Sequence, residues 1–124
     1  MLRATARVLK PGGVTVFHVI RLGSTPDAEI EATRRDVGPS LARRDDDLPE
    51  LMRSAGLRGV EAEDVTPEFR ETMRLWHEGY ATFEKGLVES MGREDYEEIV
   101  AGRERDLKAI DDGLLRRTRY VGRR

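Results

Sequence analysis

Residues 7–13 read RVLKPGG and residues 14–20 read VTVFHVI, and this stretch decides the fold. Pro11 cannot continue a helix, and Gly12 and Gly13 give the backbone the freedom for a sharp reversal. The seven residues that follow are β-branched or aromatic nearly throughout, which is typical of a strand covered on both faces in the middle of a parallel sheet. The stretch therefore predicts a helix, a tight turn and a central strand.

The helix before this turn is predicted over residues 1–9. Leu2, Ala6 and Leu9, with Val8 beside them, recur at spacings of three and four, which is the pattern of a helix packed on a sheet. No capping residue precedes them. We therefore expect that a further part of the domain belongs upstream of this helix.

Downstream of the central strand, residues 27–36 predict a short charged helix and residues 43–47 a mobile loop. Residues 48–56 predict another helix, capped by Asp47 and ended by Gly56. Its expected buried face consists of Leu48, Leu51, Met52 and Ala55. A strand over residues 57–65 follows, so that this helix and strand have the length of one α/β repeat.

A helical hairpin is predicted next. Thr66 as the cap and Pro67 at the first helical position begin a helix that extends to residue 91. A second helix covers residues 94–110, and the two should pack antiparallel. The apolar positions expected on the seam of the first helix are Phe69, Met73, Trp76, Tyr80, Phe83 and Leu87.

The last predicted strand covers residues 114–122, with Leu115 and Val121 on one face and Thr118 and Tyr120 on the other. The whole chain therefore predicts one α/β domain. Residues 1–66 and 113–124 form its sheet and flanking helices, and residues 67–112 form a helical hairpin inserted before the last strand.

Charge and composition exclude several classes of function. The 22 basic side chains nearly balance the 24 acidic ones, so we expect neither nucleic acid nor a membrane as a partner. The arginines at the end of the chain should solvate one face of a terminal strand and protect its edge; they are Arg116, Arg117, Arg119, Arg123 and Arg124. The absence of cysteine excludes disulfides and thiol nucleophiles, and the composition favours a soluble, cytoplasmic protein.

The quoted stretch resembles the segment of class I S-adenosylmethionine (SAM) dependent methyltransferases that joins the fourth crossover helix to strand five, most like the small-molecule type 11 group. Residues 48–66, LPELMRSAGLRGVEAEDVT, resemble the next helix and strand six. Residues 111–124, DDGLLRRTRYVGRR, resemble the last strand, which in this family inserts antiparallel between strands five and six. The resemblance implies the C-terminal half of a Rossmann-like sheet with three strands.

This resemblance implies SAM-dependent methyl transfer to a small-molecule acceptor in the complete fold. The family's glycine-rich SAM-binding turn follows its first strand, whereas Gly12 and Gly13 follow a helix and precede a strand. We therefore expect that the chain lacks the SAM-binding half, has no cofactor-binding residues and binds no SAM alone, and its own activity stays open. The alternative is a non-catalytic module or truncated product that forms a homodimer or pairs with a partner strand through the exposed sheet edge at residues 14–20.

Four residues are candidates for substrate binding. His18 lies in the strand whose carboxyl end faces substrate in the family, although a histidine inside a strand can equally be structural. Trp76, His77 and Tyr80 share one helical neighbourhood, with core packing as the alternative for Trp76 and Tyr80. The sequence assigns no catalytic residue. It predicts no metal site either, because the two histidines lie far apart in the chain.

Overall fold

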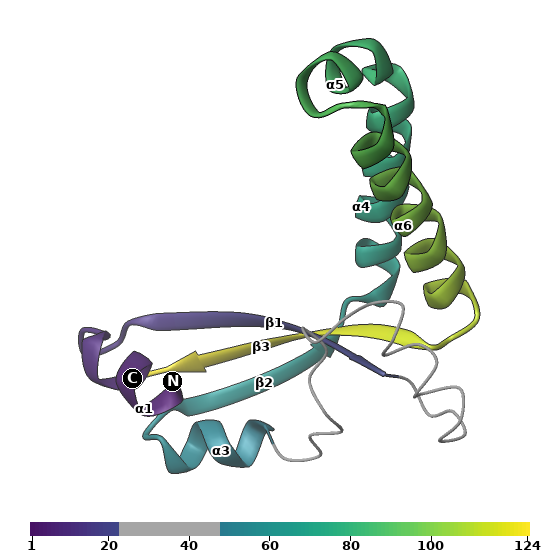
Figure 1. The fold of residues 1–124 in the computed structure, drawn as a ribbon. Helices are drawn as coiled ribbons and strands as arrows, with labels where there is room; N and C mark the ends of the chain where they lie inside the picture. The colour runs from purple at the N-terminus through teal and green to yellow at the C-terminus, as the bar shows by residue number, and fades with distance from the viewer. Residues whose placement is uncertain (23–47) are drawn as a thin grey trace.

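The computed structural model describes residues 1–22 and 48–124 (Figure 1). The helix predicted at residues 27–36 and the loop at residues 43–47 lie outside this part. The elements are α1 (Leu2–Val8), β1 (Val14–Leu22), α3 (Leu48–Ser54), β2 (Arg58–Asp64), α4 (Thr66–Thr82), α5 (Glu84–Met91), α6 (Arg93–Asp111) and β3 (Leu115–Arg123).

The described residues form a three-stranded sheet in the order β1-β3-β2. Strand β3 lies between the other two and is antiparallel to both, with Val14 opposite Arg123 at one end and Leu22 opposite Leu115 at the other. This confirms the predicted insertion of the last strand. Helices α1 and α3 lie against one face of the sheet, and the hairpin rises on the opposite side at one end (Figure 1).

The central position of β3 changes the role of its arginines. They were expected to protect an edge, but β3 has a neighbour on each side. Instead, Arg116 lies 3.4 Å from Asp64, and Arg119 pairs with Glu63. These arginines therefore bind the acidic side chains of β2, and the expectation of edge protection was wrong because it assumed a terminal place for the last strand.

The turn between α1 and β1 needs both of its glycines. Gly12 has a φ of 77°, a conformation that residues with a side chain rarely adopt. A Cβ on Gly13 would lie only 2.8 Å from the carbonyl oxygen of Lys10. The turn is also bound to the end of β3, because the amide of Gly12 donates to the carbonyl of Arg124 at 2.9 Å and the amide of Arg124 donates to Gly13 at 2.9 Å.

One face of β1 is covered and the other is not. Phe17 and Val19 pack into a core with α1 and α3, whereas Val14 and Val16 on the opposite face are 45% and 51% exposed. The expectation that this strand is covered on both faces was therefore wrong for the described residues. A run of β-branched residues indicates a strand, but the cover of its second face depends on elements elsewhere.

The core on the covered face is built around Met52, Leu57, Ala6 and Tyr120. Leu2, Leu9 and Leu48 pack against it as predicted. Val8 and Leu51 do not, since they are 81% and 52% exposed. Val8 comes one position before Leu9, and Leu51 one position before Met52. One position is a rotation of about 100° around a helix, so these side chains point away from the sheet.

The hairpin consists of α4 and α6 packed antiparallel, as predicted, but its first arm is interrupted. Phe83 ends α4 and α5 begins at Glu84, so the predicted continuous helix to residue 91 is two helices. Thr66 was expected to cap α4, yet its hydroxyl accepts the amide of Arg117 at 3.0 Å. The carboxylate of Asp64 accepts the amide of Thr66 at 2.9 Å instead, and this hydrogen bond, assisted by Arg116, lowers the pKa of Asp64.

Candidate functional site

The hairpin stands at the end of the sheet where β1 and β2 finish, because α4 follows directly on β2 (Figure 1). In open α/β sheets, ligands bind outside the carboxyl ends of parallel strands. We call the angle between the uncovered face of the sheet and the hairpin the inner corner. It is defined by Val16 and His18 of β1 and by Trp76 of α4.

A small core fixes the hairpin to the sheet. Its buried members are Phe69, Met73, Ala109, Ile110 and Leu115. Leu115 is 1% exposed, and Ile20 of β1 packs against the same group. The guanidinium of Arg117 lies over the Phe69 ring, 5.4 Å from its centroid. Phe69 therefore marks the side of α4 that faces the sheet.

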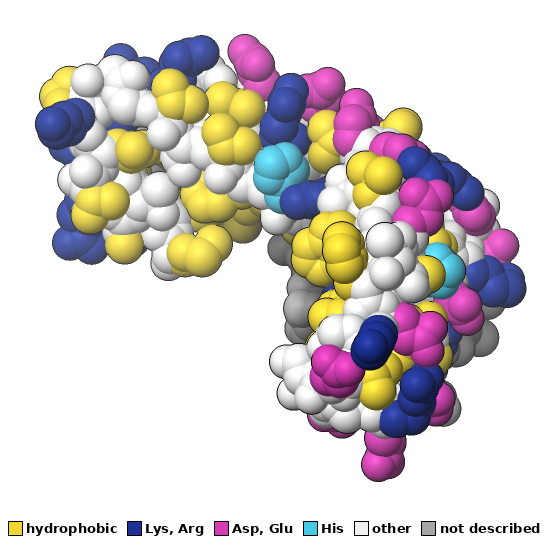
Figure 2. Space-filling model, turned by 90° about the horizontal axis from the view of Figure 1, so that it is seen from above, with side chains coloured by type: hydrophobic (Ala, Val, Ile, Leu, Met, Phe, Trp, Pro, Cys, Tyr) yellow, Lys and Arg dark blue, Asp and Glu magenta, His cyan; other side chains and the backbone are white. Residues whose placement is uncertain are grey.

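Trp76 and Phe83 follow Phe69 along the hairpin. Seven residues bring a helix back to within about 20° of the same direction, so Trp76 lies on the same side of α4 as Phe69, whereas Phe83 follows the last residue of the helix. Trp76 is 52% exposed and Phe83 is 67% exposed. The prediction that both are buried in the helix–helix seam was therefore wrong for Phe83, whereas Trp76 contacts Arg103 of the second helix but stays half exposed. Figure 2 shows hydrophobic side chains on the side of the hairpin toward the sheet and on the uncovered sheet face.

Trp76 is held by a charged side chain of the second hairpin helix. The guanidinium carbon of Arg103 lies 5.0 Å from the centroid of the Trp76 ring, and Arg103 Nη1 lies 3.4 Å from Asp106 Oδ2. Arg103 Nε is buried and has no partner among the described residues. No local pattern in the sequence predicts this contact, because the two residues lie on different helices. The Trp76 ring is thus a half-exposed aromatic surface with the guanidinium of Arg103 packed against it.

His77 and Tyr80 lie in the contact between the hairpin helices. His77 Nε2 is 3.3 Å from Glu104 Oε1. The rings of Tyr80 and Tyr96 have centroids 6.4 Å apart, and the Tyr96 hydroxyl donates to the Tyr80 carbonyl at 3.0 Å. Burial raises the pKa of Tyr96. The three candidates on the hairpin thus differ: Trp76 is half exposed beside Arg103, whereas His77 and Tyr80 join the two helices.

His18 belongs to the uncovered face of β1, where its side chain is exposed. It lies opposite Arg119 in the strand register, and Arg119 is held by Glu63. Of the residues that define the inner corner, His18 lies on the sheet and Trp76 lies on the hairpin. Their roles in substrate binding stay predictions.

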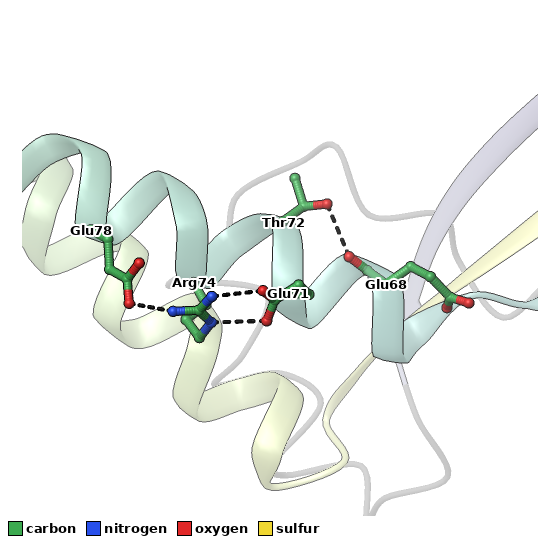
Figure 3. Close-up of polar contacts among 5 residues, drawn as sticks. All are labelled: Glu68, Glu71, Thr72, Arg74 and Glu78. Atoms are coloured by element: carbon green, nitrogen blue, oxygen red, sulfur yellow. Dashed lines mark hydrogen bonds and ion pairs between the residues drawn. The ribbon is translucent and has the colours of Figure 1, made fainter.

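The opposite side of α4 carries a chain of ion pairs (Figure 3). Arg74 donates to Glu71 at 2.6 and 2.8 Å and also pairs with Glu78. The Thr72 hydroxyl donates to the carbonyl of Glu68 at 2.9 Å. Hydrogen bonding to Glu71 raises the pKa of Arg74, and the same contact lowers the pKa of Glu71. The hairpin therefore has a charged outer side and an apolar inner side.

The described residues do not fit a SAM cradle. The amide of Gly12 is taken by Arg124, and the amide of Gly13 donates to Lys10 at 2.8 Å. The connection from β2 to α4 contains no glycine, and Pro67 has no amide hydrogen to offer an anion.

Within residues 1–22 and 48–124, no three acidic or histidine side chains are grouped to hold a metal ion. No helix in this part has both the length and the apolar character needed to cross a membrane.

Asp106, the carboxyl group beside Arg103, should make the stability of the protein depend on pH. Burial raises the pKa of Asp106 above its ordinary value of 3.8, against the opposing effect of Arg103 and Arg105. A carboxyl whose pKa is raised on folding costs stability above that pKa, and the cost vanishes below the unfolded value. Asp106→Asn should therefore raise the thermal midpoint at neutral pH, and the gain should fade as the solution becomes more acidic. Thermal melts between pH 3 and 7 would check this, with Glu98→Gln as an exposed control; a gain that grows with acidity would contradict it.

No protein-family model matches the sequence. No curated protein matches it. Solved structures do. Phosphoethanolamine N-methyltransferase 2 of Haemonchus contortus, in complex with phosphomonomethylethanolamine and S-adenosylhomocysteine, matches over 99% of this chain and 29% of that chain, with 19% identity and a TM-score of 0.82.

Two further structures show how widely this fold is used. The cyclopropane synthase MmaA2 of Mycobacterium tuberculosis matches over 99% of this chain and 48% of that chain, with 13% identity and a TM-score of 0.81. The [4+2]-cyclase SpnF matches over 99% of this chain and 42% of that chain, with 22% identity and a TM-score of 0.66. The chain thus spans less than half the length of each of these structures.

Proposed function

We propose, on the premise that the chain has the fold of the C-terminal part of a class I SAM methyltransferase, that it supplies the acceptor side of a SAM-dependent methyl transfer to a small molecule. The observation that carries this proposal is the position of the hairpin, which the core around Leu115 fixes at the carboxyl ends of β1 and β2. Trp76, on the first helix of that hairpin, is 52% exposed.

The chemistry asked of these residues is mainly positioning. Methyl transfer is a direct displacement, so the protein gains most by holding the acceptor in line and by excluding water. Val16 and Trp76 offer apolar surface for the acceptor, and His18 offers an imidazole that can remove its proton. The methyl donor would be held by the SAM-binding half of the complete fold.

The division of the chain follows from the same proposal. Residues 1–66 and 113–124 provide the sheet and its flanking helices, and residues 67–112 provide the inserted hairpin. Among the described strands β1 has a neighbour on one side only. We infer that its other edge pairs with the strands of a SAM-binding half. That edge and the exposed Val14 and Val16 equally favour the second candidate, a non-catalytic module that binds a partner strand or a second copy.

A chimera tests the proposal. The chain would replace the matched portion of the Haemonchus enzyme, which has been solved with S-adenosyl-L-methionine. We expect SAM binding by the chimera in isothermal titration, no SAM binding by the chain alone, and release of S-adenosylhomocysteine with small-molecule amines or phenols. Trp76→Ala should reduce this release by about tenfold or more without weakening SAM binding.

Glu71→Gln, on the outer side of the same helix, is the matched control and should leave the release unchanged. A chimera that binds SAM but responds equally to both substitutions would contradict an acceptor site at the inner corner. SAM binding by the chain alone would contradict the assignment of the methyl donor to other residues.

A further inference from the structure

The charges of this nearly neutral chain are separated in space. Residues 66–112 carry 13 acidic and 7 basic side chains, a net charge of −6. The described remainder, residues 1–22, 48–65 and 113–124, carries 11 basic and 4 acidic side chains, a net charge of +7. Figure 2 shows basic side chains at the end of the sheet away from the hairpin, and acidic side chains interspersed with basic ones over the hairpin.

The basic excess concentrates where α1 and the two chain ends lie, remote from the hairpin (Figure 1). Residues 1–22 and 113–124 contain no acidic side chain at all. Arg116 and Arg119 are paired with acidic side chains of β2. The basic side chains of this end of the sheet are Arg3, Arg7, Lys10, Arg58, Arg123 and Arg124.

A hollow of about 520 Å³ opens between these groups. Arg3, Arg7 and Arg124 line it together with Ser54 and Gly56, and none of its lining side chains is a carboxylate. Arg3 and Arg7 are four residues apart on α1, a spacing at which like charges repel. Among the described residues, no carboxylate lies within ion-pair distance of either one. A bound anion would relieve this repulsion.

Arg124 is positioned beside α1 by its own contacts. Its Nη1 donates to the carbonyl of Arg7 at 3.0 Å and to that of Leu9, and its main chain is bonded to Gly12 and Gly13. Its Nε and Nη2 donors have no partner within residues 1–22 and 48–124. A guanidinium held in this way offers two adjacent N–H groups, the arrangement that binds phosphate oxygens in pairs.

We propose that this hollow binds a phosphate or diphosphate group of a soluble small molecule through Arg3, Arg7 and Arg124. Its size is within the range of about 300–1,000 Å³ that is usual for ligand pockets. It lies at the end of the sheet opposite the inner corner, so it is separate from the proposed acceptor site and does not depend on that proposal.

Isothermal titration of the full chain with inorganic pyrophosphate at low ionic strength tests the site. Saturable binding of one equivalent is expected, and it should weaken as salt is added. The double variant Arg3→Gln/Arg7→Gln should bind about tenfold more weakly or worse, because it removes two charge-assisted contacts. The double variant Lys85→Gln/Arg105→Gln makes the same charge change on the hairpin and should bind within about twofold of the parent chain.

Three results would overturn the proposal. The first is the absence of saturable pyrophosphate binding. The second is an equal loss in both double variants, which would indicate only the long-range field of the molecule. The third is binding to phosphatidylglycerol vesicles without binding to pyrophosphate, which would indicate a surface for lipid headgroups. Circular dichroism of each variant would establish that the helical content is retained.

Discussion

Leu115→Ala is expected to lower the free energy of unfolding by about 2–5 kcal/mol, the range for a large side chain removed from a well-packed core. Leu115 is 1% exposed and lies where β3 begins, between the sheet and the base of both hairpin helices. Its truncation leaves a cavity between Phe69 and Ile110, which fix the hairpin. Urea unfolding followed by circular dichroism would measure the loss.

Leu75→Ala is the matched control, because Leu75 is 52% exposed on the hairpin. It should cost no more than about 0.5 kcal/mol, as is usual for exposed positions. Amide exchange should also become faster throughout α4 and α6 in the Leu115 variant, because the base of the hairpin would open more often. Equal losses in the two variants would mean that the core around Leu115 does not anchor the hairpin.

Gly122→Val is expected to destabilise the protein by about 1–3 kcal/mol through overpacking. A Cβ at this position would lie 2.9 Å from Met52 Cε and 3.3 Å from Leu57 Cβ. Met52 and Leu57 are almost fully buried, so the surrounding side chains have little room to move. The close approach of α3 to the central strand therefore depends on glycine, and the same urea measurement would show the cost.

Gly79→Ala provides the opposite control. Gly79 is in the interior of α4, and a Cβ there would meet no atom within 4 Å. Because alanine is the better helix former, this change should stabilise the protein by about 0.5–1 kcal/mol. If Gly122→Val were harmless, α3 would not lie against β3 as described.

Much of the architecture could be predicted from the sequence. The turn at Pro11 to Gly13 is a local signal, since proline and glycine restrict the backbone in known ways. The two faces of the last strand followed from its period of two, which puts Leu115 and Val121 on one face and Thr118 and Tyr120 on the other. The insertion of this strand between the other two came from the family resemblance, because antiparallel pairing over such distances leaves no local pattern.

The errors share a physical cause. Phe83 has the spacing of a helix–helix seam, but α4 ends just before it, and its side chain is 67% exposed. Thr66 is a good capping residue, yet a strand that arrives 51 residues later takes its hydroxyl. Arg103 on Trp76 and the arginine-lined hollow depend on residues far apart in sequence. Such contacts arise from tertiary packing, which single-sequence patterns do not encode.

Cysteine cross-linking tests the central claim most directly, because the chain contains no natural cysteine. The claim is that β3 returns antiparallel to β1 and so places the inserted hairpin at the carboxyl end of that strand. Val16 and Val121 are opposite each other in this register, and such pairs are close enough for a disulfide. Val16→Cys/Val121→Cys should therefore oxidise readily to an intramolecular disulfide, whereas Val16→Cys/Arg119→Cys, two residues out of register, should not. Equal oxidation of both pairs, or of neither, would contradict the fold from which the proposed acceptor site was derived.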